Sequence, residues 1–402
     1  MNLEKITVLL IFFFGLRAEA QDIKRVQKHI DTLCSAAMFG RGYVREGDKK
    51  TAQWIAQQFE KIGLQSFRKT YFQTFPLQVN TFDEEPTFKW GKKSLKVGKD
   101  YLPQATSGSG NVKAKPYRLK EEIFTNEEDQ KEFLTTNLKN KAIIYPHEWQ
   151  SRIMSLPDHL FNKFSESPLH IASTKKLVHT VSWAQTSAVS VLVLEEYTQK
   201  LPSRVHACVG SNLKKVFSQN VVGYVSGTSQ PDSFIVFTAH YDHLGGIGKS
   251  VFFPGANDNA SGVAMLLELA YYFNDNPHAY SIVFIAFGAE EAGLIGSRYF
   301  VENPLFPLSN IAWVMNLDLV ATGEKGATVV NGTVFKEDFD KLVAINAEKG
   351  YLPALYARGK AANSDHYFFS EKGVKSFFIY LMGDWSHYHD VEDRPPVPRS
   401  KF

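Results

Sequence analysis

Residues 234–243 read Phe-Ile-Val-Phe-Thr-Ala-His-Tyr-Asp-His, and this stretch decides the fold class. An apolar run rich in β-branched and aromatic residues passes directly into histidine and aspartate, which is typical of a buried strand that ends in a loop. Three further runs end in the same way: residues 281–287 before 288–291, residues 311–317 before Asp318, and residues 374–381 before 387–389. In open α/β sheets, ligands bind beyond the carboxyl ends of the strands. The sequence therefore predicts an α/β fold in which these distant loops meet.

The residue types in these loops predict a metal site. Zinc-like ions are bound by imidazole and carboxylate groups, and two ions in one site favour a carboxylate that bridges them. We assign one ion to His240 and Asp318, and the other to Glu291 and His389. Asp258 is the predicted bridge between the two ions.

Two acidic residues remain for other roles in this site. Glu290 is the predicted general base, because two ions about 3.5–4 Å apart lower the pKa of a water toward about 7 and an unligated carboxylate can take its proton. Asp242 follows His240 by two residues, a spacing that turns both side chains to one face where the strand continues. The Asp242 carboxylate is predicted to accept the far ring N–H of His240 and so to fix its tautomer.

The motifs resemble those of the co-catalytic di-zinc peptidases typified by bacterial leucyl aminopeptidase and aminopeptidase Y. Beside Gly40-Arg41-Gly42, the resemblance rests on six segments in order: residues 239–245, 254–262, 288–297, 315–318, 364–366 and 388–393. It implies a three-layer α/β sandwich with a mostly parallel, mixed central sheet of the zinc-peptidase phosphorylase/hydrolase-like type. It also implies two Zn²⁺ per chain, the metal roles assigned above, and exopeptidase activity on the free amino termini of peptides.

One position departs from the pattern of this family. Many of its aminopeptidases have a tyrosine three residues before the Ser-Asp-His run, where it helps to stabilise the oxyanion, and this chain has Ala361 there. Tyr356, Tyr367 or another group is open as a substitute, and so is stabilisation by the metals alone.

Other functions are weighed against the aminopeptidase. A carboxypeptidase or dipeptidase of the same superfamily would use the same metals and would differ only in the groups that recognise the substrate terminus. A glutaminyl cyclase on this fold uses one zinc, and the complete pair of His240 and Asp318 argues against it. A catalytically silent binding protein would lack ligands, and none is missing. Structural or supporting roles are expected for the remaining polar residues near the motifs, which are His243, Asp365, His366 and His387.

Composition bounds the class of protein. The 402 residues are 44% apolar, which suffices for a large α/β domain and a smaller unit. With 45 Lys and Arg against 42 Asp and Glu, and no basic patch with interleaved aromatic residues, nucleic acid is not an expected partner. The sequence does not decide whether Cys34 and Cys208 form one disulfide or stay as two free thiols. It does not decide the oligomeric state either.

The amino-terminal residues predict export. Lys5 precedes the apolar run 6–16, and Ala18-Glu19-Ala20 forms a cleavage site, so residues 1–20 are predicted to be a secretory signal peptide. The run is too short for an ordinary membrane span. The mature protein is therefore expected to be secreted or periplasmic, without a membrane span.

The remaining chain is predicted to divide into three parts. Residues 21–84 begin the catalytic domain, with a helix over residues 49–61 that ends near Gly63, and residues 216–402 complete it with the metal site. Residues 85–215 are expected to form an inserted domain, similar to the protease-associated lid domains of some relatives. Within it, residues 178–194 predict a helix and then a strand. A lid that restricts access to the metals and an insertion without substrate contact are both open.

Overall fold

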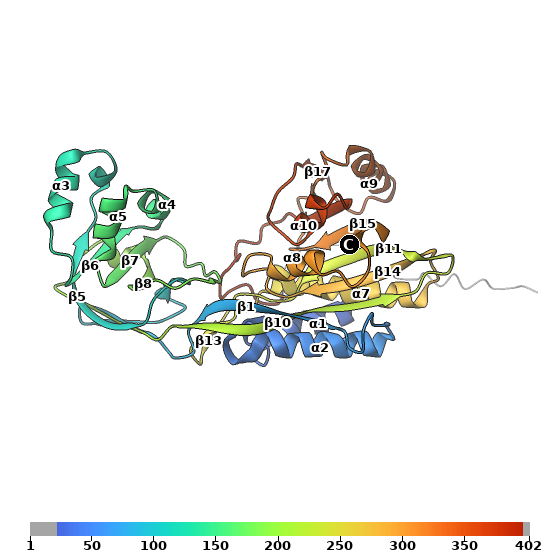
Figure 1. Ribbon diagram of the computed structural model, residues 1–402, viewed down its shortest axis with the longest axis horizontal. Helices are drawn as coiled ribbons and strands as arrows, with labels where there is room; N and C mark the ends of the chain where they lie inside the picture. Colours follow the sequence, from blue (N-terminus) through green and yellow to red (C-terminus); the bar gives the residue numbers. More distant parts are fainter. Residues whose placement is uncertain (1–21, 397–402) are drawn as a thin grey trace, which may run out of the picture.

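The computed structural model describes residues 22–396, so the predicted signal peptide over residues 1–20 lies outside the described part of the chain. Two eight-stranded sheets account for most of the strands between residues 22 and 396. They lie beside each other along the longest axis of the molecule, as Figure 1 shows. Within this described range, no helix has the length and apolar character needed to span a bilayer.

The first sheet combines strands from both ends of the chain in the order β1-β10-β14-β11-β15-β18-β16-β17. Its strands are β1 (Phe72–Thr81), β10 (Asn212–Val225), β11 (Gln230–His240), β14 (Tyr280–Phe287), β15 (Ile311–Leu317), β16 (Ala327–Val330), β17 (Leu355–Arg358) and β18 (Ser376–Leu381). The central strands β14, β11, β15 and β18 are mutually parallel. The pairs β1–β10, β10–β14 and β16–β18 are antiparallel. The four apolar runs predicted from the sequence form the parallel centre of this mixed sheet.

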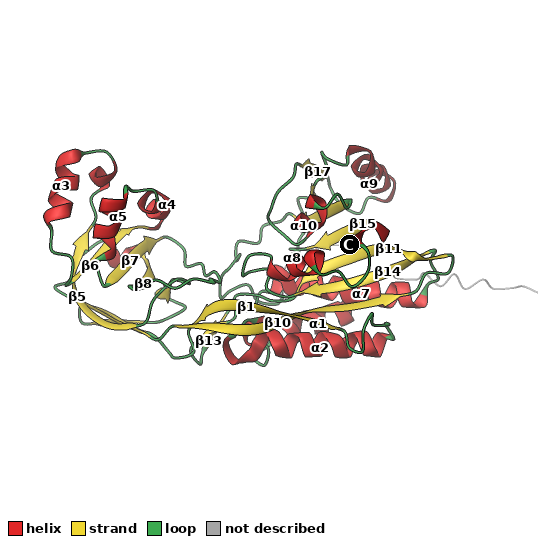
Figure 2. Cartoon of the chain, viewed as in Figure 1, coloured by secondary structure: helices red, strands yellow, loops and turns green. Residues whose placement is uncertain are grey.

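Helices cover both faces of the first sheet and make three layers (Figure 2). One face packs against α1 (Ile23–Leu33), α2 (Gly47–Ile62) and α7 (Ser261–Asp275) in one apolar core. The other face packs against α8 (Ile295–Glu302) and α10 (His366–Glu371), while Phe339 of α9 (Lys336–Lys349) packs with β16 and β18. Strand β14 is buried from Ser281 to Phe287, because a strand between two helical layers has no solvent-facing side. The predicted three-layer α/β class is therefore confirmed.

Helix α2 shows how the sequence sets an element boundary. It spans Gly47–Ile62, close to the prediction of residues 49–61, and its buried face includes Ile55 and Phe59. It ends at Gly63, whose φ of 93° is in the left-handed region that glycine adopts at low cost.

The second sheet is formed entirely by residues between β1 and β10, in the order β3-β2-β9-β5-β6-β7-β8-β4. Its strands are β2 (Thr87–Trp90), β3 (Lys93–Leu95), β4 (Tyr101–Pro103), β5 (Gly110–Arg118), β6 (Lys141–Pro146), β7 (Leu169–Thr174), β8 (Val189–Leu194) and β9 (Val205–Val209). The same stretch of chain contains α3 (Glu127–Thr135), α4 (Gln150–Met154), α5 (Asp158–Ser165) and α6 (Glu195–Thr198). Two short strands, β12 (Gly246–Ile247) and β13 (Val251–Phe252), pair with each other after β11. Cys34 and Cys208 are free thiols.

The prediction of a helix before the strand in residues 178–194 is wrong. Strand β8 is present, but residues 178–188 are irregular. Their backbone groups bond to other segments instead of to each other, as in the bonds from His179 N–H to His389 O and from Thr186 N–H to Thr106 O. The apolar residues of this stretch therefore pack against different elements, whereas a helix would align them on one face.

Candidate metal centre

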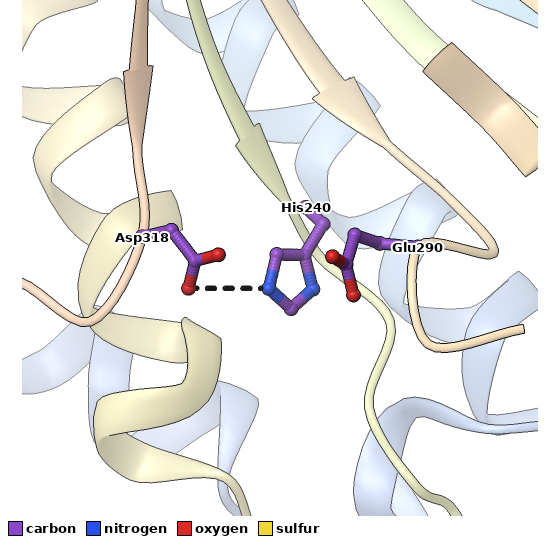
Figure 3. Close-up of side chains that lie close together, drawn as sticks. All are labelled: His240, Glu290 and Asp318. Carbon is purple, nitrogen blue, oxygen red and sulfur yellow. Dashed lines mark ion pairs between the residues drawn. The ribbon is translucent and has the colours of Figure 1, made fainter. Parts of the chain in front are cut away.

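The predicted ligands converge at the carboxyl ends of the parallel strands. His240 is the last residue of β11, Asp318 follows β15, and Glu290 and Glu291 lie just beyond β14. Figure 3 shows His240, Glu290 and Asp318 reaching one site from three neighbouring strands. His389, in the loop after β18, completes the group. The loops at these strand ends therefore meet at one place, as the sequence predicted.

Asp258 lies between the two histidines. One carboxylate oxygen, Oδ1, is 3.4 Å from His240 Nε2, and the other, Oδ2, is 3.3 Å from His389 Nε2. Asp318 Oδ1 is also 3.4 Å from His240 Nε2, and Glu291 Oε2 is 3.3 Å from His389 Nε2. The two halves of the site therefore meet at a single carboxylate, as the predicted bridging role requires.

The loop that carries Asp258 is fixed by buried polar groups. The Asp393 carboxylate accepts the backbone N–H groups of Asn257, at 3.0 Å, and of Asp258, at 3.1 Å. Gly255 has a φ of 60°, and a Cβ there would lie 2.1 Å from the Asp258 carbonyl oxygen, so only glycine fits. The peptide bond that follows Asp258 is cis.

Arg41 binds this loop to the end of β11. Its guanidinium is fully buried and donates to the main-chain oxygens of Tyr241 at 2.8 Å, Gly255 at 2.8 Å and Asp258 at 3.1 Å. It also donates to the carbonyl oxygens of Leu33 and Pro254. The sequence singled out Arg41 only as part of a motif, and the structure shows that one side chain joins two ligand-bearing segments.

Asp242 contacts the site differently from the prediction. The His240 Nδ1 atom lies 3.1 Å from the main-chain oxygen of Asp242, whereas the nearer carboxylate oxygen is 3.9 Å away. The carboxylate instead accepts the backbone N–H groups of Glu290, at 3.0 Å, and Glu291, at 3.2 Å. Strand β11 ends at His240, so the chain turns before Asp242 and the alternation of a continuing strand does not apply.

Three further polar residues lie near the cluster, and two of them, His243 and Asp365, were expected to have structural or supporting roles. His243 is fully buried, and its Nδ1 lies 2.7 Å from Glu291 Oε1 and 4.0 Å from Asp258 Oδ2. Ser364 donates to Asp318 Oδ2 at 2.8 Å and accepts from Asn316 at 2.7 Å. Asp365 is fully buried, and neither of its oxygens has a hydrogen-bond partner among the described residues. The sequence identified His243 as a polar residue near the motifs, but not its contact with Glu291.

A tyrosine also lies against the site. Tyr388, which the sequence singled out only as part of a motif, stacks on the His389 ring with 3.9 Å between centroids and 16° between planes. Of the two tyrosines considered as substitutes at the Ala361 position, Tyr356 lies on the edge strand β17 and Tyr367 on α10.

Buried carboxylates dominate the electrostatics. Burial alone would lower the pKa values of both histidines, but Asp318 and Glu290 raise that of His240 well above its usual range. Glu291 and Asp258 likewise raise the pKa of His389 to about 10. Burial raises the pKa of Glu290 well above its usual value, and nearby Glu291 adds to the shift against the opposing effect of His240. Glu290 thus differs in proton affinity from the adjacent Glu291, whose pKa the histidines lower against burial and the Asp258 charge.

The residues present fit metal ions. Two groups have ligand atoms within 4.8 Å of one another: His240, Glu290 and Asp318, and His243, Asp258 and Glu291. The Nε2 atoms of His243 and His389 are buried without a hydrogen-bond partner in the described chain. Closely spaced buried carboxylates repel one another unless cations offset their charge, and imidazole with carboxylate is the donor set of catalytic zinc. The site is therefore suited to divalent cations.

Comparison with known proteins agrees with this geometry. Residues 220–399 match the family described as Peptidase family M28. Aminopeptidase YwaD of Bacillus subtilis is 33% identical over 190 residues, which are 44% of this chain and 39% of that protein. A probable zinc metalloprotease of Pyricularia oryzae is 38% identical over 111 residues, 27% of this chain and 22% of the relative. A probable lipoprotein aminopeptidase, LpqL of Mycobacterium tuberculosis, is 46% identical over 81 residues, 20% and 16% of the two chains.

The similarity to these relatives is thus confined to part of their length, at most 39% among the three. Solved structures share the fold over nearly the whole chain. BSAP, a zinc aminopeptidase from Bacillus subtilis, superposes with a TM-score of 0.65 at 22% identity, covering 92% of this chain and 88% of its own. A Peptidase M28 precursor from Shewanella amazonensis gives a TM-score of 0.63 at 15% identity, with coverage of 92% and 88%.

Proposed function

We propose that this chain, whose residues 220–399 match peptidase family M28, is a zinc aminopeptidase that removes amino-terminal residues from peptides. The observation that carries the proposal is the position of Asp258, whose two oxygens face His240 and His389 at 3.4 and 3.3 Å. This arrangement suits two cations that share one carboxylate, and co-catalytic hydrolysis needs two cations.

The ligand assignment follows the contacts. His240 and Asp318 would hold one zinc ion, Glu291 and His389 the other, and Asp258 both. When bound, zinc supplies Lewis acidity that polarises the scissile carbonyl and makes a water more acidic. Ser364 donates a hydrogen bond to Asp318, and the His243 ring forms a hydrogen bond with Glu291. Each half of the site therefore has a further residue that orients a carboxylate.

Glu290 is the general base in this proposal. Its carboxylate accepts a proton as the water oxygen attacks the carbonyl carbon, and it returns that proton to the amine nitrogen as the C–N bond breaks. The raised pKa of Glu290 suits the first step, because a carboxyl that is a weaker acid has a carboxylate that is a stronger base. Asp242 orients this residue by accepting its backbone N–H.

Substrate hydrolysis by purified mature protein tests the proposal. Free and amino-acetylated aminoacyl chromogenic substrates and peptides are assayed before chelation, after chelation, and after zinc is returned. Activity on free amino termini alone, lost on chelation and restored by zinc, is the expected result. Cleavage from the carboxyl end would identify a carboxypeptidase. One zinc per chain, with cyclisation of amino-terminal glutamine, would identify a glutaminyl cyclase.

Export is a further part of the proposal. The support is the sequence pattern of residues 1–20, with Lys5 before an apolar run and a small-residue cleavage site. Amino-terminal sequencing of protein recovered from the medium or the periplasm should begin at Gln21. Recovery of the uncleaved chain in the cytosol would contradict export.

A further inference from the structure

An irregular segment of the second unit reaches the metal centre. Residues 176–183, named here the connecting segment, lie between β7 and β8 of the second sheet, and Figure 1 shows this part of the chain running toward the first sheet. It contacts three loops that carry predicted ligands, those of His389, Asp258 and the Glu290–Glu291 pair.

The strongest contacts are with the His389 loop. Lys176 Nζ donates to Ser386 O at 2.5 Å and to Tyr388 O at 3.4 Å, and it lies 3.7 Å from Asp390 Oδ2. The His179 backbone N–H donates to the His389 carbonyl at 3.1 Å. The three hydrogen bonds join the second unit to main-chain oxygens of the predicted metal ligand His389 and of two residues just before it.

The backbone of His389 needs such support. Its φ is 55°, in the left-handed region that a residue with a Cβ adopts only at a cost in free energy. A strained conformation persists where the surroundings fix it, and here those surroundings include the Lys176 ammonium and the His179 N–H. Without them, the loop can relax, and the His389 imidazole then leaves its place beside Asp258 and Glu291.

The same segment packs on the other two loops. The His179 ring is buried and stacks on Phe253 with 5.0 Å between centroids and 9° between planes, just ahead of the loop that carries Asp258. Val181 packs in an apolar cluster that includes Ala289 and Ala292, on either side of the two glutamates. Burial lowers the pKa of His179 to about 3, so this ring is neutral and acts by packing. These contacts fix the place of the segment. Of the three ligand-bearing loops in the described chain, the His389 loop is the one that accepts hydrogen bonds from it.

We infer that Lys176 and His179 are positioning residues for His389, so that the second unit sets the affinity of the metal position formed by Glu291 and His389. The inference rests on the proposed function, because it takes that position to bind zinc. The second unit then helps to position a metal ligand, in addition to any effect that it has on substrate access.

Zinc affinity of the full-length mature protein tests this inference without relying on activity. The metal-free protein is titrated with zinc against a competing chelator, and the binding step lost in His389→Ala identifies the position in question. Lys176→Met removes the ammonium and keeps the apolar stem. Lys176→Met should lower the zinc affinity of the position identified by His389→Ala about tenfold, which is the low end for loss of a group that orients a metal ligand. The zinc affinity of the other position should stay unchanged. Lys176→Arg, which keeps the charge, should recover most of the affinity.

The matched control is Lys175→Met, because Lys175 is an exposed neighbour that donates to none of these carbonyls. It should bind zinc like the wild type. Two unchanged steps in Lys176→Met would overturn the inference and leave the proposed function intact. Equal weakening of both steps, with a lower unfolding temperature of the metal-free protein, would show a general structural role and would also overturn it. A wild-type protein that binds fewer than two zinc ions would overturn the proposed function itself.

Discussion

Replacing Glu290 with glutamine separates a general base from a ligand. Glu290, His240 and Asp318 have ligand atoms within 4.8 Å of one another, so proximity alone admits both roles. Glutamine keeps the size of the side chain but cannot carry the proton from water to the leaving amine. Because general acid–base catalysis contributes about 10²–10⁴-fold, kcat should fall by that factor. At 1.36 kcal/mol per tenfold, the loss is about 2.7–5.4 kcal/mol of transition-state stabilisation.

The assay measures kcat and KM on a free aminoacyl substrate together with the zinc content of the same sample. In Glu290→Gln, zinc content and KM should equal those of the wild type, because Asp258 already serves both ions. Glu291→Gln is the matched control and should lose zinc, since its carboxylate lies 3.3 Å from His389 Nε2. Loss of one zinc from Glu290→Gln, or turnover equal to that of the wild type, would refute the assignment of Glu290 as base.

Substitutions at three other positions test how buried polar groups affect stability. Asp242→Asn should lower the free energy of unfolding in urea by about 1–3 kcal/mol, because one of the two partly buried N–H groups that bond to the carboxylate is left unpaired. Arg41→Met should yield little folded protein, and Arg41→Lys more. Five unsatisfied main-chain acceptors at about 1–3 kcal/mol each together cost as much as the whole free energy of unfolding of a typical domain, about 5–15 kcal/mol. Asp48 is 4% exposed, and burial raises its pKa to about 7, above the value near 3.9 of an unfolded chain. The contribution of Asp48 to stability is therefore lost as pH rises from about 4 through 7. Asp48→Asn should raise the unfolding temperature at pH 8 but not at pH 4, and an equal gain at both would contradict this.

Strand ends and ligand chemistry were accessible from the sequence. The four apolar runs identify the parallel strands because such strands are buried on both faces, and His240 and Asp318 then follow from their places at the strand ends. Asp258 was accessible for a different reason, the residue types that two cations require.

Loop geometry was not accessible in the same way. The Asp242 carboxylate binds two N–H groups of another loop because the chain turns at His240, and the sequence does not state where a strand stops pairing. The contact between His243 and Glu291 depends on the same turn. The irregular course of residues 178–188 depends on partners more than a hundred residues away, including His389, and local periodicity contains no information on such partners.

The pairing of β1 with β10 has a consequence for how the two units came together. Thr81 and Asn212, the residues at which the chain leaves and re-enters the first sheet, are partners in one antiparallel ladder. A tight hairpin turn could join them directly, so the whole second unit can be gained or deleted without shifting the register of any metal-bearing strand. A shortened chain of this kind would keep its sheet and lose the bonds from Lys176 and His179 to the His389 loop. Removal of the second unit would thus leave the topology of the first sheet unchanged, but it would remove the support that we infer for the zinc position at His389.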